Sequence, residues 1–414
     1  MKDFFNRIKR TFLIFLIVIG PGLITAFADN DAGGVATYSV AASKYGYKIL
    51  TILIPITVVL AVTQEIGARI AIVTGKGLGD LIRERFGIKI SLFVFSVVFI
   101  VNFGVILQDL SGLKGSLQLF QLDYRIFLPL VLLALFFVVI KSNYSKIERF
   151  FLFLILFYLT YFFSAVMAKP DWNLALKSMI IPPGKVSFDY LYTSIAVLGT
   201  TVTIWGQFFI NSVVKDKKLT IDNLKYEKWE VYFSSILSDI ATWFIMLAVI
   251  GTIYKNHVVI QGAEDAALAI KPFAGELAGV LFGVGLFVAG FLGCAIVPLA
   301  TAYAFSEFFG YSGSLDSDFK KSRLFYSLFI VQIVIGFIIV FQQGFSLFKF
   351  TLIADFVNGI SLPLIFYFLY SLSNNEHIMG KYKNTKTQNV LLVGSGIIIS
   401  LGSILGILGK LLNF

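Results

Sequence analysis

The feature that most constrains this chain is a series of eleven apolar runs, nearly all of them long enough to cross a membrane as a helix. About 20 apolar residues in a helix span the roughly 30 Å hydrocarbon layer of a bilayer. The runs cover residues 11–42, 47–72, 88–111, 126–141, 148–168, 190–214, 229–254, 274–306, 322–342, 347–373 and 388–411. We therefore predict an all-α integral membrane protein with eleven transmembrane helices.

The composition agrees with this prediction and excludes a soluble protein. Hydrophobic residues make up 57% of the chain and charged residues 14%, whereas soluble domains carry about 25% charged residues. The polar stretches between the runs are short, so we expect one polytopic membrane domain over residues 1–414. The first run follows the charged segment MKDFFNRIKR, but it is too long for a signal peptide and lacks a small-residue cleavage site, so we expect a retained helix.

Lysine and arginine are distributed unequally between the two sides of the predicted bundle. If successive helices alternate in direction, the N-terminal tail and the loops after the even-numbered helices hold 22 of these residues, and the other side holds 11. Loops rich in Lys and Arg stay in the cytoplasm, so we expect a cytoplasmic N-terminus and an extracellular C-terminus in the plasma membrane. The net charge of +10 then reflects topology and lipid contact. We expect no nucleic-acid binding, because no basic stripe is interleaved with aromatic residues.

Two of the predicted helices are interrupted by polar residues and glycines near their middles. The interruption in the first helix consists of Asp29, Asn30, Asp31, Gly33 and Gly34. The interruption in the sixth helix consists of Gly199, Thr200, Thr201, Thr203, Gly206, Gln207 and Asn211. Ionisable groups and irregular backbone at this depth persist where they line a cavity or an ion path. The alternatives are a cap or kink for the acids of the first helix, and close helix packing for the small residues of the sixth.

The two interrupted helices occupy corresponding places in two successive groups of five. Such pairs are typical of secondary transporters built from inverted repeats, in which the substrate binds between the broken helices. We therefore predict a first repeat over residues 11–168, a second over 190–373 and an extra helix over 388–411.

The sequence also resembles a known family over part of its length. The stretches GPGLITAFADNDAGGVATYSVAASKYGYK (20–48) and TQEIGARIAIVTGKGLGDLIRERFG (63–87) are similar to the start of the Nramp divalent-metal transporters. This resemblance implies the LeuT-like fold of two inverted five-helix repeats, here with an eleventh helix. Counted without gaps, the family's Asp-Pro-Gly-Asn motif falls on Asp31 to Gly34, and its Ala-x-x-Met-Pro-His motif falls on Thr200 to Trp205. The family's metal-binding Asp is therefore kept as Asp31, whereas its Asn is Gly34 and its Met is Thr203.

Further departures concern the positions that the family uses for protons. A second family histidine falls on Ile210, and the acidic position linked to proton exit falls on Gly112, next to Asp109. The family's ion-contacting Gln in the tenth helix falls on Asp355. This pattern is similar to the Nramp-related magnesium transporters of prokaryotes, which implies transport of Mg²⁺ and Mn²⁺ without proton coupling.

The residue chemistry at the positions that the resemblance assigns also supports a hard cation. Thioether and thiolate ligands select soft metals, whereas oxygen-only sites suit magnesium, calcium or manganese. Thr203 removes the soft ligand, Gly34 removes volume and a carbonyl ligand, and Cys294 lies in the eighth helix. Magnesium dehydrates reluctantly and is held through one or two carboxylates and several waters. A widened site around Asp31 therefore fits a partly hydrated cation.

These considerations give two sets of candidate residues. The predicted metal site consists of Asp31, Gly34, Thr200, Thr203, Gln207 and Asp355. A possible ion pathway consists of Asp29, Asn30, Asn211, Asp239, Asn358 and Asp109. The alternative for Asp239 is a partner within the bundle. For Glu65 and Arg69, four residues apart, we predict a structural ion pair.

The leading functional hypothesis is uptake of Mg²⁺ and also Mn²⁺ by a secondary transporter, with the ion as substrate and no cofactor. A monomer would suffice, and no Walker phosphate loop is present in the chain for ATP-driven transport. The runner-up is a sodium- or proton-coupled symporter of a small organic solute, although the acids near the interruptions argue against a carboxylate substrate. An intramembrane metallohydrolase would need a His-Glu-x-x-His signature that the sequence lacks, so we do not expect an enzyme. A passive channel would usually need an oligomer with charged or carbonyl rings.

Overall fold

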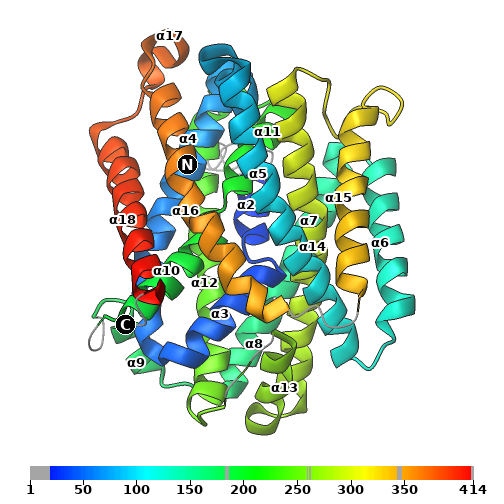
Figure 1. The fold of residues 1–414 in the computed structure, drawn as a ribbon, viewed down its shortest axis with the longest axis vertical. Helices are drawn as coiled ribbons and strands as arrows, with labels where there is room; N and C mark the ends of the chain where they lie inside the picture. The colour runs from blue at the N-terminus through cyan, green and yellow to red at the C-terminus, as the bar shows by residue number, and fades with distance from the viewer. Residues whose placement is uncertain (1–18, 182–185, 259, 261–262, 343–346, 412–414) are drawn as a thin grey trace, which may run out of the picture.

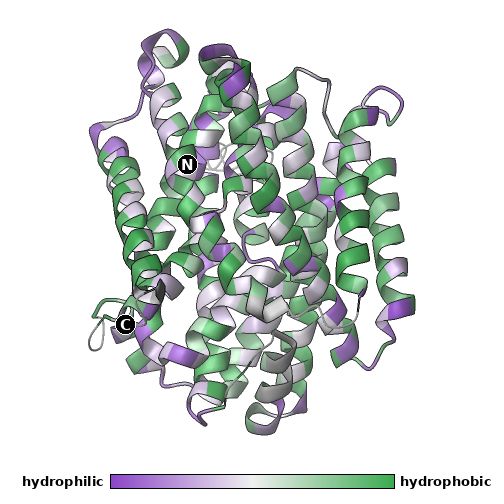
Figure 2. Ribbon diagram, in the orientation of Figure 1, coloured by the Kyte–Doolittle hydropathy of each residue, from purple (hydrophilic) through white to green (hydrophobic). Residues whose placement is uncertain are grey.

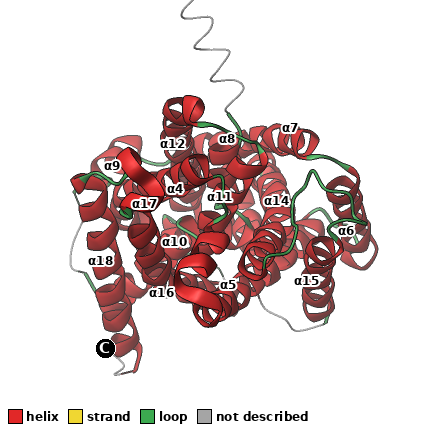
Figure 3. Ribbon diagram, turned by 90° about the horizontal axis from the view of Figure 1, so that it is seen from above, coloured by secondary structure: helices red, strands yellow, loops and turns green. Residues whose placement is uncertain are grey.

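The computed structural model describes residues 19–181, 186–258, 260, 263–342 and 347–411. The basic N-terminal tail and the start of the first predicted helix, residues 1–18, lie outside this part. All the regular secondary structure of the described residues is helical (Figure 3). Ten helical stretches are long and apolar enough to cross a membrane, and the first, Ala32–Thr74, has 43 residues. At about 1.5 Å per residue this stretch is long enough to cross twice, so the prediction of an all-α membrane bundle is confirmed.

The helices follow the predicted runs closely. The first five runs correspond to α2 (Pro21–Ala28) with α3 (Ala32–Tyr45), η1 (Gly46–Ile52) with α4 (Leu53–Thr74), α5 (Leu78–Leu119), α6 (Tyr124–Lys141), and α7 (Tyr144–Ile155) with η2 (Leu156–Tyr158) and α8 (Leu159–Ala168). The remaining runs correspond to α10 (Phe188–Thr201) with α11 (Ile204–Asp216), α12 (Leu224–Val249) with η4 (Ile250–Tyr254), α14 (Glu276–Phe309), α15 (Arg323–Phe341), α16 (Leu347–Ser373) and α18 (Lys386–Leu411). Connections contain α9 (Trp172–Ser178), η3 (Ile221–Asn223), α13 (Ala263–Ala274), α17 (Glu376–Met379) and η5 (Gly380–Tyr382).

The broken helices lie in the middle of the bundle. In Figure 1, α2 and α3 occupy the centre, α6 and α15 lie at one edge and α18 lies at the opposite edge; Figure 3 shows α6 and α15 opposite α18 from above as well. The outer helices are strongly hydrophobic along most of their length (Figure 2). Exposed apolar side chains such as Phe137 and Ile398 are therefore placed to face lipid, while the polar residues of the breaks are surrounded by other helices.

Close packing of α5 against α14 positions one acid of the core. A side chain at Gly293 of α14 would place its Cβ 2.2 Å from the Asp109 carboxylate, and one at Gly290 would lie 3.0 Å from the Asp109 carbonyl oxygen. On the other side of α5, a Cβ at Gly112 would lie 2.2 Å from the Cβ of Ala32. Small residues thus let α5 fit between α14 and α3, which brings Asp109 to the break in the first helix.

The loops predicted to share the cytoplasmic side contact one another. Arg83, after the second helix, donates to the Glu307 carbonyl at the end of the eighth (2.6 Å). Asp216, at the end of the sixth, accepts from the Ser314 hydroxyl after the eighth (2.9 Å). The Tyr144 amide, after the fourth, donates to Asp316 (3.0 Å). These contacts support the predicted alternation of helix directions, while the assignment of this face to the cytoplasm rests on its excess of Lys and Arg.

The predicted ion pair in the second helix is confirmed. Arg69 Nε lies 2.9 Å from Glu65 Oε1, and both side chains are buried. The guanidinium also donates to Asn384 (2.7 Å), and Gln388 of α18 donates to Glu65 (2.6 Å). This buried network joins the eleventh helix to α4.

Candidate cation site

The first helix is interrupted over only three residues. Asp29 follows the end of α2, and Asp31 is the N-cap of α3, where its Oδ1 accepts the Gly34 amide at 2.7 Å. The predicted interruption extends to Gly34, but Gly33 and Gly34 already belong to α3. The physical reason is that a capping carboxylate satisfies a free amide of the first turn and so lets the helix restart early. The cap considered as an alternative for Asp31 is therefore present.

The break in the sixth helix is shorter still. Val202 and Thr203 separate α10 from α11, and the Thr203 hydroxyl accepts the Gly206 amide at 3.0 Å as the N-cap of α11. The Asn358 side chain of α16 accepts the Ile204 amide at 3.1 Å. Two side chains thus satisfy the start of α11, so the other small and polar residues of the predicted interruption lie within helices.

The two breaks meet at Asp29. Thr203 Oγ1 donates to Asp29 Oδ1 at 2.7 Å, and Gln64 Nε2 of α4 donates to Asp29 Oδ2 at 3.2 Å. We call Asp29, Thr203 and Gln64 the Asp29 cluster. Each oxygen of this buried carboxylate accepts one protein donor, so Asp29 ties the two breaks together in this conformation.

A second group of acids surrounds the start of α3. Asp109 Oδ1 of α5 accepts the Ala32 amide at 3.0 Å, beside the Asp31 cap. Asp355 of α16 accepts from Gln108 Nε2 (3.1 Å) and from Thr37 Oγ1 (2.5 Å). The three carboxylates lie close enough to interact electrostatically. We call Asp31, Asp109, Asp355, Gln108, Thr37 and Thr200 the Asp31 cluster; every member is 2% exposed or less.

Gly34 lies at the narrow gap between the two clusters. A Cβ at this position would lie 2.9 Å from the Asp29 carbonyl oxygen and 3.2 Å from Thr200 Oγ1. The Thr200 side chain also interacts with Asp355. The absence of a side chain at Gly34 therefore leaves room for this carbonyl and this hydroxyl oxygen beside the start of α3, and the widened site stays a prediction.

The predicted metal residues accordingly fall into three places. Asp31, Gly34, Thr200 and Asp355 come together, whereas Thr203 belongs to the Asp29 cluster. Gln207 faces α4, where its amide nitrogen donates to Thr63 Oγ1 at 3.3 Å.

Four of the predicted pathway residues make contacts of other kinds. Asn211 donates to the Gly67 carbonyl of α4 at 3.0 Å, and Asn358 caps α11. Asn30 is fully bonded to α12, as described below. Asp239 is one of the residues that line a side pocket between α4 and α12, and it interacts electrostatically with Asp29 of the first break.

Gln108 and Thr37 are part of the cluster but were not among the predicted site residues. The Gln108 Oε1 atom has no hydrogen-bond partner in the described part of the chain, and a Cβ at Gly33 would lie 2.7 Å from it. In the sequence, the only indication of their role is that an amide and a hydroxyl side chain occur within apolar helices, at about the depth of the interruptions.

The α2 segment is bonded to α12 at both of its ends. At its start, Glu230 accepts the amides of Gly20 (3.1 Å), Gly22 (3.1 Å) and Leu23 (2.8 Å). At its end, Asn30 Nδ2 donates to the carbonyl and hydroxyl oxygens of Ser238 (both 3.0 Å) and its Oδ1 accepts from Thr242 (2.7 Å). The role of Asn30 in this conformation is therefore to hold the break against α12.

The chemistry of the Asp31 cluster is that of a hard-cation site. Its members offer carboxylate, amide and hydroxyl oxygens, beside the Asp29 carbonyl. The buried Cys294 thiol of α14 lies close enough to Asp109 and Asp31 to interact electrostatically, which the sequence did not predict. Buried acids are costly unless they are paired or coordinate a cation, and the N-terminus of α3 compensates only part of their charge. Within the described residues, no three His, Cys, Asp or Glu side chains form a metal-binding group. An ion here would therefore use one or two carboxylates and complete its shell with neutral oxygens.

Comparison with known proteins places this arrangement in a family. A family model described as natural resistance-associated macrophage protein-like, abbreviated Nramp, matches residues 22–409. The chain belongs to the Nramp family. The departures at Gly34 and Thr203 thus lie at the breaks of an Nramp protein, where they face the Asp29 carbonyl and the Asp29 carboxylate.

Curated relatives of this Nramp chain match it along nearly their whole length. The protein named divalent metal cation transporter MntH of Caldanaerobacter subterraneus subsp. tengcongensis is 24% identical over 405 residues, covering 94% of this chain and 93% of the relative. The protein of the same name from Bacillus subtilis (strain 168) is 23% identical and covers 93% of this chain and 90% of its own.

Solved structures confirm the fold. The structure of a mutant of the Eremococcus coleocola manganese transporter superposes on 95% of this chain and on 88% of its own chain, with a TM-score of 0.74 and 17% identity. The structure of a Na⁺-coupled sialic acid symporter superposes on 97% of this chain and on 95% of its own chain, with a TM-score of 0.55 and 14% identity. At these identities the overlaps show the fold alone. The predicted LeuT-like architecture is thus confirmed, while the repeat boundaries at 11–168 and 190–373 stay a prediction.

Proposed function

We propose that this chain is a secondary transporter that takes up divalent cations, Mg²⁺ and also Mn²⁺, through the Asp31 cluster. The observation that carries the proposal is the gathering of three buried carboxylates, Asp31, Asp109 and Asp355, with neutral oxygen donors at the break in the first helix. Transport of divalent metals is also the activity named for the relatives, and manganese transport is named for the structural neighbour. The preference for magnesium, as in the Nramp-related magnesium transporters, is inferred from donor chemistry, because hard oxygen ligands suit Mg²⁺ and Mn²⁺.

Asp31 is the main charged ligand in this proposal. Its Oδ1 caps α3, and its Oδ2 would bind the cation. The Asp29 carbonyl and the Thr200 hydroxyl both lie next to Gly34, and Gln108 Oε1 is without a partner among the described residues. These neutral oxygens, with Asp355 behind Gln108, could bind the ion directly or through retained waters. In this conformation the Thr203 hydroxyl holds the break through Asp29, and Gln207 contacts Thr63 of α4.

The absence of obligatory proton coupling is the second part of the proposal. Ile210, where the family has a histidine, is completely buried and packs in a small apolar cluster with Ala68 and Val214. Such a position cannot exchange a proton. Uptake would then follow the electrochemical gradient, with α2, α3, α10 and α11 rearranging around the ion and with the basic face of the bundle toward the cytoplasm.

The test is uptake into proteoliposomes with a magnesium dye and a pH dye enclosed together. We expect Mg²⁺ influx by the natural protein without a matching change of internal pH, and loss of influx in Asp31→Ala. The matched control is Glu84→Ala, which removes an exposed acid paired with Lys76 in a loop and should transport normally. Influx through Asp31→Ala at more than half the natural rate would overturn the site assignment. Acidification in step with Mg²⁺ would overturn the absence of proton coupling.

A further inference from the structure

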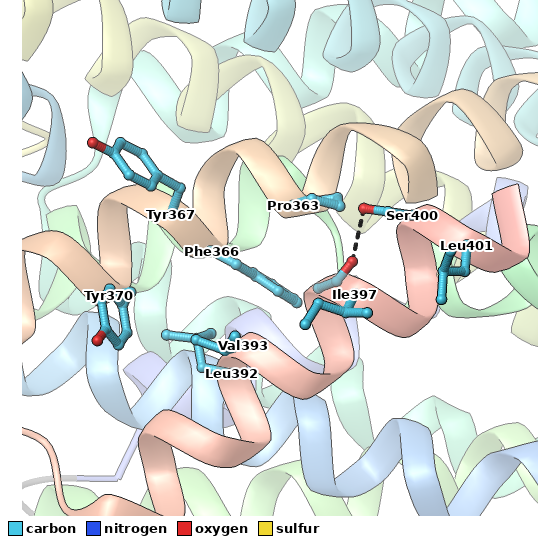
Figure 4. A pocket seen from close by; sticks show the side chains of 10 residues that line it. Pro363, Phe366, Tyr367, Tyr370, Leu392, Val393, Ile397, Ser400 and Leu401 are labelled. Atoms are coloured by element: carbon cyan, nitrogen blue, oxygen red, sulfur yellow. Dashed lines mark hydrogen bonds between the residues drawn. The ribbon is translucent and has the colours of Figure 1, made fainter. Parts of the chain in front are cut away.

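A large apolar pocket lies on the side of the bundle between α16 and α18, and we call it the α16–α18 groove. Its volume is about 480 Å³, and its lining is apolar apart from the hydroxyl groups of Tyr367, Tyr370 and Ser400 (Figure 4). The Ser400 hydroxyl donates to the Gly396 carbonyl of its own helix at 2.8 Å. The wall of the groove therefore suits a hydrocarbon chain, and the polar groups at its ends decide which molecule carries that chain.

The groove is about as long as one leaflet of a bilayer is deep. Figure 4 shows Tyr367 and Tyr370 at one end of it and Leu401 at the other. Along α18 the lining runs from Leu392 to Leu401, and these nine helical steps rise about 14 Å. Half of the roughly 30 Å hydrocarbon layer of a membrane is about 15 Å. The groove can therefore hold an acyl chain of one leaflet along its whole length.

The two tyrosines mark the end of the groove that lies next to the loop between α16 and α18. Tyr370 is three residues from the end of α16, and the Tyr367 ring also contacts Phe86 of α5, with 6.2 Å between the ring centroids. Tyrosine is enriched where the hydrocarbon layer meets the polar surface of a membrane. The loop belongs to the face of the bundle that is rich in Lys and Arg, so this end of the groove reaches the lipid headgroups on that face.

Cationic side chains lie at the same end of the two helices. Arg85 of α5 donates to the Ser371 carbonyl at 3.2 Å, which places its guanidinium at the end of α16. Lys381 lies in the loop and Lys386 begins α18, and all three cations are exposed. None of them forms an ion pair with an acid in the described part of the chain. Their charges therefore favour an anionic group at the headgroup level.

We propose that the α16–α18 groove binds an anionic phospholipid, with one acyl chain along the groove and the phosphate group beside Arg85. A second copy of the chain could also cover an apolar side of the bundle. A twofold pair in one membrane would, however, bring two sets of the same cations to the same level, and their repulsion opposes such a pair. The lipid site is separate from the Asp31 cluster, and it does not depend on which ion the protein transports.

The test is native mass spectrometry of the full-length protein in detergent, titrated separately with phosphatidylglycerol and with phosphatidylcholine of the same acyl chains. We expect the natural protein to bind one phosphatidylglycerol at least about tenfold more tightly than phosphatidylcholine. Because each surface Lys or Arg attracts anionic lipid by about 1 kcal/mol, or about fivefold in affinity, Arg85→Ala should weaken phosphatidylglycerol about fivefold and leave phosphatidylcholine unchanged. Gly396→Phe, which places a ring in the groove and keeps every charge, should weaken both lipids.

Two matched variants serve as controls and should bind both lipids as the natural protein does. Arg149→Ala removes an exposed cation of α7. Gly394→Phe adds the same ring to α18 outside the lining of the groove, where a Cβ would meet no atom within 4 Å.

Three results would overturn the proposal. The first is equal affinity of the natural protein for the two lipids, and the second is an equal effect of Arg85→Ala and Arg149→Ala. The third is a dimer that Gly396→Phe dissociates, because a second copy would then fill the groove. If Gly396→Phe fails to fold, the comparison of Arg85→Ala with Arg149→Ala decides alone.

Discussion

Removing the Thr203 hydroxyl should separate the two breaks without changing the size of the side chain. This hydroxyl accepts the Gly206 amide and donates to Asp29. Thr203→Val keeps the volume and loses both bonds. Loss of an N-cap costs about 0.5–2 kcal/mol, and loss of a hydrogen bond to a charged group costs about 1.5–3 kcal/mol. Because one group makes both bonds, we expect a total of about 2–4 kcal/mol.

The measurement is the free energy of unfolding in detergent micelles by denaturant titration. Thr203→Ser is the matched control, because it keeps the hydroxyl and loses only a methyl group, at about 0.8 kcal/mol. A double-mutant cycle with Asp29→Ala, which removes the acceptor, isolates the bond between the breaks, for which we expect a coupling energy of about 0.5–3 kcal/mol. If Thr203→Val is as stable as Thr203→Ser, or if the coupling energy is zero, the hydroxyl does not hold the breaks together.

Two further predictions concern helix packing and ion preference. A Cβ at Gly199 would lie 2.1 Å from the Asp355 carbonyl oxygen, so Gly199→Ala should destabilise the protein by about 1–3 kcal/mol or more and reduce uptake. Gly104→Ala is the matched control: its new Cβ would lie 3.7 Å from the nearest atom, so both the free energy of unfolding and the uptake should stay unchanged. If Gly199→Ala and Gly104→Ala have equal effects, the packing argument is wrong. Thr203→Met should raise the ratio of Mn²⁺ to Mg²⁺ uptake relative to Thr203→Val, which lacks the hydroxyl equally but adds no thioether. An unchanged ratio in competition uptake would refute the role of ligand softness.

The breaks could be predicted from the sequence because their residues are out of place in an apolar helix. Acids, glycines and threonines at mid-membrane depth indicated both interruptions. Their extent could not be predicted, because it depends on which side chain caps the next half-helix. Asp31 and Thr203 satisfy the first amides locally, and this leaves Gly34 and Gln207 inside helices.

The partners of each polar residue were harder to predict than its depth. Gln108 and Asp355 are 247 residues apart in the chain, and their contact depends on how α5 and α16 pack. The same limit applies to Asp239. Its helix has apolar residues on most sides, so the sequence does not indicate whether the acid faces the centre or the side pocket. Asp355 was placed near the site only through the family resemblance.

The attachment of α2 to α12 has a mechanical consequence. Three amides at the start of α2 and the Asn30 side chain at its end are bonded to α12. At about 0.5–3 kcal/mol for each bond, it costs less for the two helices to tilt as one rigid lever than for α2 to swing alone. Any movement of the first break during transport would then be passed on to α12, and from α12 to the helices α4 and α8 that pack against it.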